Sequence, residues 1–308
     1  MVWRVTKDLD GKGENVTAGV TKKTDISPYA LINHDVPHFR IAPPSGWWNV
    51  DFRELWAFRD LFGILVLRDI KLRYRQTALG VSWVILQPLL TSFIFAVIFG
   101  SLAKLPSDGT PYMLFVFSGM LPWTLFAQGL QRAGNSMVAD ARLISKIYFP
   151  RLIIPVASAS AVLIDFAVSC VVMVILLLLY GFTPSLTWFA VLPLTAVTLL
   201  IAIGASLLFS ALNVYYRDFM YALPFVIQTW MYASPLVYSA SLVPEGNARI
   251  VYGLNPMAGV IDGFRWALLG HRDFPAIGLA TSVLGAVAIT LFGMWVFQRV
   301  ERNFADVI

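Results

Sequence analysis

The sequence is poor in charged residues. Asp, Glu, Lys and Arg make up 13% of its 308 residues, while hydrophobic residues make up 58%. Soluble globular chains carry about 25% charged residues. The mean hydropathy is +0.70. A water-soluble fold would leave too much apolar surface exposed, so this composition excludes a soluble globular protein and predicts a chain whose solvent is the lipid bilayer.

Cysteine and histidine are also scarce. Cys170 is the single cysteine, which excludes a disulfide-stabilised chain. The histidines are His34, His38 and His271. His34 and His38 flank Asp35 in a polar segment bordered by proline, where we expect solvated loop residues rather than a metal site. A membrane enzyme acting on lipid-linked sugars would need convergent catalytic groups, and these histidines do not form such a set.

A phosphate-binding loop is absent from the sequence. No segment matches Gly-x-x-x-x-Gly-Lys-Ser/Thr, and the Gly-Lys-Gly at residues 11–13 lacks the spacing and the hydroxyl of such a loop. We therefore expect no ATP and no other cofactor bound by this chain. The net charge of +5 is interpreted through membrane topology, and nucleic acid is not an expected partner.

Long hydrophobic runs dominate what is present. A helix needs about 20 apolar residues to cross the hydrocarbon core. Six stretches reach that length: residues 83–102, 112–130, 152–180, 188–212, 219–238 and 277–296. The sequence predicts an all-α polytopic membrane protein with six transmembrane helices.

The distribution of Lys and Arg predicts the orientation of these spans. With the N-terminus inside, thirteen Lys and Arg fall on the inner side and four on the outer side. The outer ones are Lys104, Arg249, Arg265 and Arg272. Because inner loops carry the excess of positive charge, both termini are expected in the cytoplasm.

Residues 51–76 predict an amphipathic helix before the first span. Leu67, Ile70 and Tyr74 recur at helical spacing, and Arg68 and Lys71 repeat that spacing one position later. An apolar stripe beside a basic one is typical of a helix lying in the headgroup plane. The chain is thus expected to comprise an N-terminal cytoplasmic extension (1–50), this interfacial helix (51–80), the six-span domain (81–298) and a cytoplasmic tail (299–308). Polar, glycine-containing residues 7–23 predict a loosely folded part of the extension.

Residues 255–270 predict a shorter helix between spans five and six. Asn255 fits the N-cap, Pro256 the first helical position and Gly270 the end. About fourteen residues are too few to span a bilayer. We expect a re-entrant or interfacial helix on the outer side.

Two kinds of polar residue are candidates for function. Arg68, Lys71, Arg73 and Arg75 form a basic cluster that either anchors topology or recognises a phosphate-bearing lipid. Asp165 lies inside the third predicted span, where an acid is costly. It either pairs within the helix bundle, which we favour, or lines a conduit. A stand-alone secondary transporter or channel would show inverted repeats or paired intramembrane charges, and we find neither.

Aromatic residues crowd the second and fifth predicted spans. Most are expected in interfacial belts or in packing. Some are candidates for stacking against the apolar faces of sugar rings. The candidates are Tyr112, Phe115, Trp123, Trp230 and Tyr232.

From about residue 41 the sequence resembles the permease subunits of ABC exporters for O-antigen and capsule-type polysaccharides. The resemblance rests on ordered motifs along most of the chain. They are Arg68-Asp69-Ile70-Lys71, Arg73-Tyr74-Arg75-Gln76-Thr77-Ala78-Leu79-Gly80, Leu86-Gln87-Pro88, Ser118-Gly119-Met120-Leu121-Pro122-Trp123, Lys146-Ile147-Tyr148-Phe149-Pro150-Arg151, Asn213-Val214-Tyr215-Tyr216-Arg217-Asp218, Leu254-Asn255-Pro256-Met257 and Gly263-Phe264-Arg265-Trp266-Ala267.

The resemblance implies a partner set and a substrate. It implies a homodimer in the bacterial inner membrane above a separate ATP-binding subunit dimer, which supplies ATP and Mg. The substrate class would be a glycan linked to undecaprenyl pyrophosphate. The loop 131–151 resembles the place where relatives carry a coupling helix that docks on the ATPase. Its candidate coupling residues are Asp140, Arg142, Leu143, Ile144, Lys146 and Ile147.

Overall fold

The computed structural model describes residues 4–7, 39–42, 52–75, 81–239, 242–243, 247–270 and 273–301. The chain divides into two compact units, Met1–Val50 and Asp51–Ile308. Residues 8–23 of the predicted loose segment 7–23 lie outside the described residues, and so do His34, Asp35, His38 and the tail residues 302–308.

The first unit contains two short strands, β1 (Arg4–Lys7) and β2 (Phe39–Ala42). They pair antiparallel, with Arg4 opposite Ala42 and Lys7 opposite Phe39. The sequence analysis assigned this unit to a cytoplasmic extension and predicted no strand in it. Polar and apolar residues alternate over the first three residues of each segment, and β-branched residues are present in both, which is the pattern of a strand.

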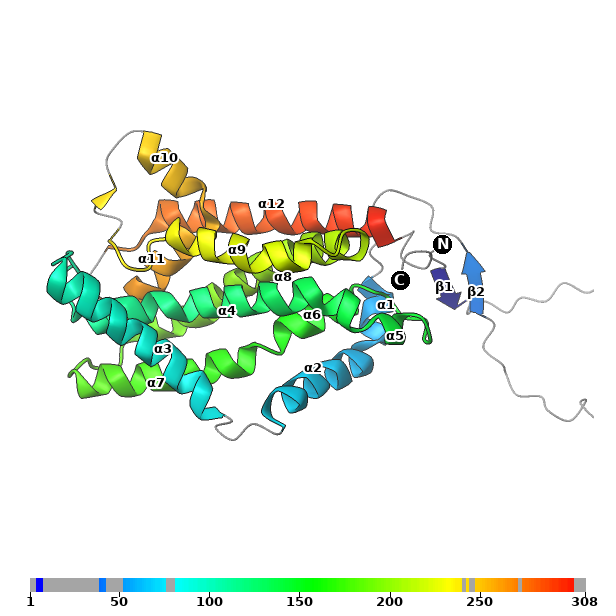
Figure 1. Cartoon of the computed structure of the whole chain (residues 1–308), viewed down its shortest axis with the longest axis horizontal. Helices are drawn as coiled ribbons and strands as arrows, with labels where there is room; N and C mark the ends of the chain where they lie inside the picture. The colour runs from blue at the N-terminus through cyan, green and yellow to red at the C-terminus, as the bar shows by residue number, and fades with distance from the viewer. Residues whose placement is uncertain are drawn as a thin grey trace, which may run out of the picture. The chain divides into compact units, whose positions relative to one another are not determined.

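The described part of the second unit is helical (Figure 1). The helices before the first long loop are α1 (Phe52–Ala57), α2 (Arg59–Tyr74), α3 (Val81–Phe95), its π-helical continuation η1 (Ala96–Leu102) and α4 (Tyr112–Ala139). They are followed by α5 (Ala141–Ile144), α6 (Ile153–Ser160), α7 (Leu163–Leu179), the 3-10 turn η2 (Leu186–Ala190) and α8 (Val191–Tyr215). The last helices are α9 (Phe219–Tyr232), α10 (Asn247–Leu254), α11 (Pro256–Leu269) and α12 (Ala276–Glu301).

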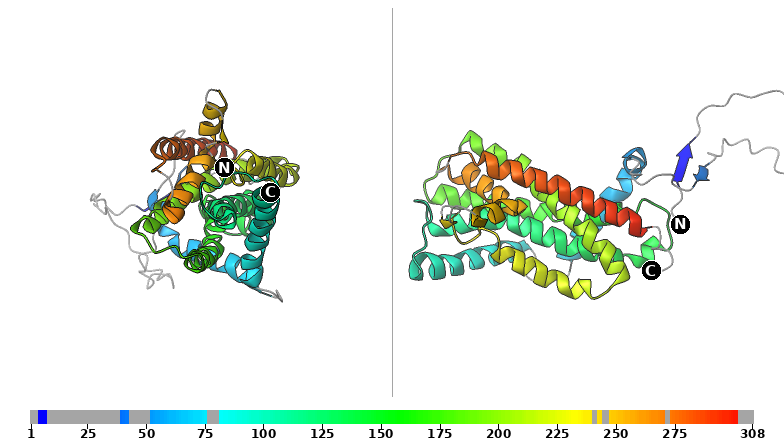
Figure 2. Two further views of the ribbon diagram at one scale, coloured as in Figure 1. Left: turned by 90° about the vertical axis from the view of Figure 1, so that its left-hand side faces the viewer. Right: turned by 90° about the horizontal axis from the view of Figure 1, so that it is seen from above.

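Helix α4 forms the centre of the bundle. It packs against α8, α6, α11, α7 and α3, and α8 in turn packs against α12. Figures 1 and 2 show α4, α8 and α12 running side by side. By contrast, α3 and α12 leave most of their apolar side chains exposed. Those faces are available to lipid or to another protein chain.

Five helical segments of the described chain are long and apolar enough to cross a membrane, so this is a multi-pass membrane protein. They are Ser82–Leu102, Tyr112–Ala139, Ile153–Leu179, Leu186–Tyr215 and Ala276–Glu301. They correspond to the predicted spans 83–102, 112–130, 152–180, 188–212 and 277–296. The predicted fifth span, 219–238, is shorter as a helix because α9 has 14 residues and ends at Tyr232.

The short helix predicted between the last two spans is confirmed. The side chain of Asn255 accepts a hydrogen bond from the backbone N–H of Met257 at 3.0 Å, which caps α11. Pro256 occupies the first turn. Gly270 ends the helix with a φ of 67°, a left-handed conformation that glycine adopts without strain.

Candidate functional site

Helix α2, which carries the predicted basic cluster, is held to the bundle mainly by polar side chains. It packs against α6. Leu65 is its one buried residue among those described. Ile64, Leu67 and Leu72 are exposed apolar residues. Because only one apolar residue of α2 is fully buried, the charged contacts along its C-terminal half contribute to its position.

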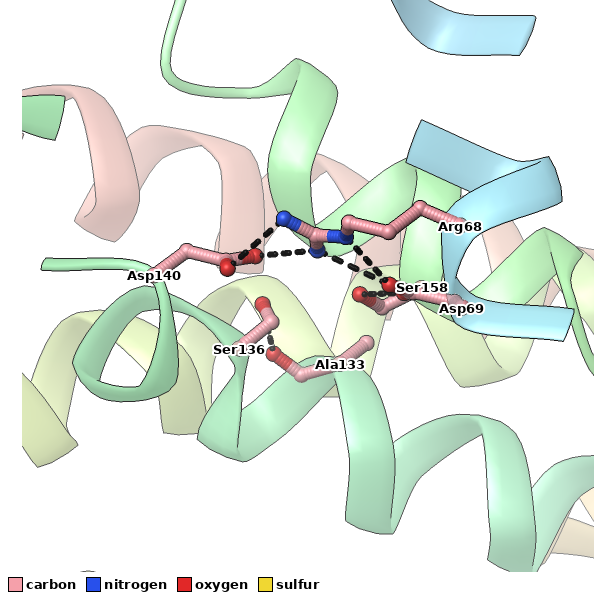
Figure 3. A network of polar contacts seen from close by, with 6 residues as sticks. All are labelled: Arg68, Asp69, Ala133, Ser136, Asp140 and Ser158. Atoms are coloured by element: carbon pink, nitrogen blue, oxygen red, sulfur yellow. Dashed lines mark hydrogen bonds and ion pairs between the residues drawn. The ribbon is translucent and has the colours of Figure 1, made fainter. Parts of the chain in front are cut away.

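Arg68 joins α2 to the end of α4 (Figure 3). Its Nη1 donates to Oδ1 of Asp140 at 2.9 Å, and its Nη2 donates to Oδ2 of Asp140 at 2.7 Å. The same guanidinium donates to Asp69 through Nε at 3.0 Å and Nη2 at 2.8 Å. Asp69 also accepts a hydrogen bond from Ser158 of α6 at 2.8 Å. The hydrogen bond to Asp140 raises the pKa of Arg68, although burial opposes the shift.

A second cluster forms around Asp165 of α7. Asp165 is 4% exposed. Tyr74 of α2 donates a hydrogen bond to its Oδ1, and Arg73 forms an ion pair with its Oδ2. Arg73 also donates to Oε1 of Gln128 at 3.1 Å. Burial, followed by repulsion from Arg132, lowers the pKa of Arg73 to about 10, so the guanidinium stays charged at neutral pH.

The cluster predicted as one basic surface therefore has two parts. Arg68 and Arg73 face carboxylates of the same chain. Lys71 and Arg75 are exposed, and their side chains form no hydrogen bond or ion pair with another described residue. The sequence analysis missed Asp140 and Ser158 as partners because they lie far from α2 in the sequence, and it missed Asp69 although Asp69 directly follows Arg68.

The region around α5 places the candidate coupling residues together after α4. Asp140 lies between α4 and α5, and its side chain makes no capping hydrogen bond. Arg142, Lys146 and Ile147 are exposed, while Leu143 and Ile144 are half-buried. This segment thus combines an apolar edge with two cations, and Asp140 ties its start to α2.

The aromatic candidates do not form one surface. Phe115 and Trp123 are buried in the core. The hydroxyl of Tyr112 donates to the backbone carbonyl of Val237, and Nε1 of Trp230 donates to Oδ1 of Asn255 at 2.9 Å. Tyr232 is exposed. Of the five, Tyr232 has the most side chain available to a partner or ligand in this conformation.

Comparison with known proteins assigns the chain to a family. The family model for the ABC-2 type transporter matches residues 60–269. The chain belongs to the ABC-2 type transporter family. The matched range includes α2 from its second residue, both charged clusters, α5, α9 and α11, and it ends before α12.

Individual relatives of this ABC-2 permease cover nearly its whole membrane unit. It is 29% identical over 251 residues to the O-antigen export system permease protein RfbA of Klebsiella pneumoniae, which covers 81% of this chain and 95% of the relative. It is 28% identical over 264 residues to the RfbA protein of Myxococcus xanthus, covering 83% and 98%. The polysialic acid transport protein KpsM of Escherichia coli is 23% identical over 241 residues, covering 77% and 92%.

Arg265 of this ABC-2 permease is a buried functional candidate that the sequence analysis counted only as a charge between the last two spans. It is 3% exposed on α11. Its Nη2 donates to the carbonyl of Leu236 at 2.8 Å, and its Nη1 and Nε donate to the carbonyls of Tyr238 and Phe115 at 3.4 Å each. The guanidinium also lies 3.7 Å from the centroid of the Phe115 ring.

The bonds to Leu236 and Tyr238 satisfy backbone carbonyls in the irregular segment that follows α9. The chain leaves the helix after Tyr232 and runs as bends to residue 239. Asn255 donates to the carbonyl of Ala233 at 3.1 Å. Further along the same segment, Arg265 and Tyr112 donate to the carbonyls of Leu236 and Val237. Irregular backbone is tolerated at membrane depth where protein groups satisfy it. The spacing of Arg265 within Gly263-Phe264-Arg265-Trp266-Ala267 was the available signal, since a charge amid apolar residues on a predicted helix requires a partner.

Proposed function

We propose that this chain is the permease subunit of an ATP-driven exporter that moves lipid-linked polysaccharide of the O-antigen type out of the cytoplasm. The observation that carries the proposal is the similarity to two O-antigen export permeases, which spans 81% and 83% of this chain and 95% and 98% of theirs. Two relatives that are both O-antigen export permeases, aligned almost end to end, favour this substrate class over other cargoes of the family. The proposed location is the bacterial inner membrane, with both termini in the cytoplasm.

The proposal includes a separate ATP-binding subunit dimer, because the sequence holds no phosphate-binding loop. We place the docking surface at α5 and the residues that follow it. Exposed Ile147 supplies an apolar contact, and Arg142 and Lys146 supply charge. Leu143 and Ile144 lie at the edge of that surface. ATP and Mg are bound by the partner.

Lipid-linked substrate is proposed to arrive at α2. Exposed Ile64, Leu67 and Leu72 suit the acyl region of a leaflet. Lys71 on the same helix and Arg75 directly after its end offer positive charge to the pyrophosphate of an undecaprenyl carrier. Arg68, whose side chain is 34% exposed, lies within the same helix. Arg73 is the member least available to a ligand because Asp165 and Gln128 engage it.

The conduit is proposed to form between two copies of the chain along α9. Tyr221, Phe225, Gln228 and Tyr232 are exposed on α9 and share one helical face by their spacing. A stripe of aromatic rings with an amide suits sugars, whose C–H faces are apolar and whose hydroxyls form hydrogen bonds. Trp230 supports this face from behind through Asn255, while Phe115, Trp123 and Tyr112 pack the helices that carry it.

Six spans are proposed, with α9 and residues 233–239 forming the fifth. Fourteen helical residues rise about 21 Å, which is less than the roughly 30 Å hydrocarbon core. The irregular residues after α9 supply the remaining length, and their carbonyls are bound by Asn255, Tyr112 and Arg265.

Deletion in the source bacterium tests the proposal. Loss of the chain should abolish surface polysaccharide and cause lipid-linked glycan to accumulate on the cytoplasmic side, because synthesis continues without export. The intact gene should restore the surface polymer. Unchanged surface glycan, with no intracellular accumulation, would contradict the proposed function.

A further inference from the structure

We infer that Asp140 acts as an intrachain substitute for a phosphate anion on Arg68, so that a phosphate-bearing ligand at α2 displaces Asp140 and releases α5. The inference rests on the proposed function, since it assigns a signalling role to the same α2 surface. It links substrate arrival at α2 to the segment proposed to dock on the ATPase.

The geometry at Arg68 is that of an anion receptor. Two parallel N–H groups meet the two oxygens of Asp140 at 2.9 and 2.7 Å (Figure 3). This fork-to-fork arrangement is the one by which arginine binds carboxylate and phosphate alike. The Arg68 side chain is 34% exposed and that of Asp140 is 17% exposed, so the pair lies at the protein surface. A phosphate oxygen can therefore reach the groups that now bind Asp140.

Displacement would release the start of α5 from α2 because the Asp140 carboxylate has no second partner among the described side chains. Its carboxylate caps neither neighbouring helix, and its hydrogen bonds run to Arg68 alone among the described side chains. Asp69, the other carboxylate on Arg68, belongs to α2 itself and is held by Ser158 of α6. Loss of the bond to Asp140 thus separates α2 from α5, whereas the attachment of α2 to α6 remains.

The energetic balance favours exchange rather than simple addition. Arg68 already directs its donors to two carboxylates, so a further anion must compete for them. A phosphate carries more charge and more acceptor oxygens than a carboxylate. Exposed Lys71 and Arg75 add positive charge within the two helical turns that follow Arg68. These features favour the phosphate when it is present and Asp140 when it is not.

Spin-label distances across the pair test the exchange. Labels at exposed Leu72 and Ser145, in a Cys170→Ala background, report the separation of α2 from the segment after α5. In phosphatidylcholine nanodiscs we expect a narrow distance distribution that broadens when inorganic pyrophosphate is added. Asp140→Asn should be broad from the start and insensitive to pyrophosphate. The released population should rise roughly tenfold, as expected for losing one charge-assisted contact.

The matched control is Asp60→Asn. Like Asp140→Asn, this change removes one negative charge, but Asp60 is an exposed residue of α2 whose partner is Arg59 of the same helix. This variant should keep the narrow distribution and the pyrophosphate response. A wild-type distribution and a wild-type response in Asp140→Asn would overturn the inference.

Two further arms assign the source of the anion and separate this inference from the export proposal. Broadening in phosphatidylglycerol nanodiscs without pyrophosphate would identify a lipid headgroup as a sufficient ligand, while broadening that requires pyrophosphate would identify the carrier-like anion. Both outcomes support the exchange. The distance measurement needs neither glycan nor ATPase. A failed export experiment therefore does not contradict the exchange at Arg68, and distances that do not respond to pyrophosphate do not contradict the proposed export function.

Discussion

At the scale of single residues, the buried acid Asp165 is explained by partners far away in the sequence. Tyr74 and Arg73 reach it from α2, more than ninety positions earlier. Inspection of the turns next to Asp165 could predict that it needs a partner, but could not identify one. Its cost in the membrane is offset because a cation and a hydroxyl meet it.

Substitution of Asp165 by Ala should destabilise the chain strongly. The change leaves Arg73, which is largely buried, without its counter-ion. Removal of one member of a buried pair costs about 3–5 kcal/mol. Thermal unfolding in detergent should shift to lower temperature. Asp218→Asn removes an exposed acid and should unfold like the wild type. Equal stability of Asp165→Ala and wild type would refute the structural role.

The double substitution Lys71→Gln/Arg75→Gln should impair export without disturbing the fold. Both side chains are exposed and lack described partners. Loss of a hydrogen bond to a charged group costs about 1.5–3 kcal/mol, or about tenfold or more in affinity for a pyrophosphate. Surface glycan is the measurement, after membrane insertion and ATPase binding have been confirmed. The control Lys71→Arg/Arg75→Lys exchanges the two cations and so retains the charge. Normal export by Lys71→Gln/Arg75→Gln would contradict pyrophosphate binding and leave these residues only a role in membrane topology.

At the scale of elements, the close contact between α11 and α12 depends on glycine. A Cβ built on Gly259 of α11 would lie 1.9 Å from the carbonyl oxygen of Gly278 on α12. The obstacle is backbone, so rotation of a side chain cannot relieve it. The same logic holds between α8 and α12, where a Cβ on Gly204 would lie 2.6 Å from Cα of Thr290. Helix α11 is thus fixed against α12 at a separation that only glycine permits.

Gly259→Ala should therefore force α11 away from α12. Overpacking of a core costs about 1–3 kcal/mol, and a backbone obstacle places this change at the upper end. The yield of folded protein and its unfolding temperature should both fall. Gly253→Ala on α10, where nothing lies within 4 Å of the new Cβ, should match the wild type. Similar behaviour of the two variants would argue against close packing at Gly259.

Local patterns in the sequence predicted most elements, but they did not predict tertiary pairing. Apolar runs located five long helices, and the cap at Asn255 with the stop at Gly270 located α11. The end of α9 was predicted too late because residues 233–238 are mostly apolar, as in a transmembrane helix. Their backbone is not helical, and Arg265 of α11 donates to one of its carbonyls. The division of the basic cluster into paired and exposed members was invisible for the same reason, since Asp140 and Asp165 are distant in sequence.

At the scale of the whole molecule, the span count decides the orientation of every loop. Reporter fusions after Asp108 and Thr183 should report the outside, and a fusion after Ala139 should report the inside. The decisive fusions are those after Arg217 and after Leu242, on either side of α9. The first should report the inside and the second the outside, because α9 and the irregular residues after it are proposed to cross the membrane together. Reports from one side at both positions would reduce the count to five spans and place the C-terminal residues on the opposite side from the N-terminus.

The central claim is that this ABC-2 permease exports lipid-linked polysaccharide with energy from a partner ATPase. Proteoliposomes containing the permease, its ATPase and a lipid-linked glycan of the source bacterium test it most directly. The measurement is the fraction of glycan protected from an external glycosidase. We predict ATP-dependent movement of glycan across the bilayer, lost with the permease alone and with a catalytically inactive partner. Movement that is independent of ATP, or no movement in a complex that hydrolyses ATP and binds the glycan, would contradict the account.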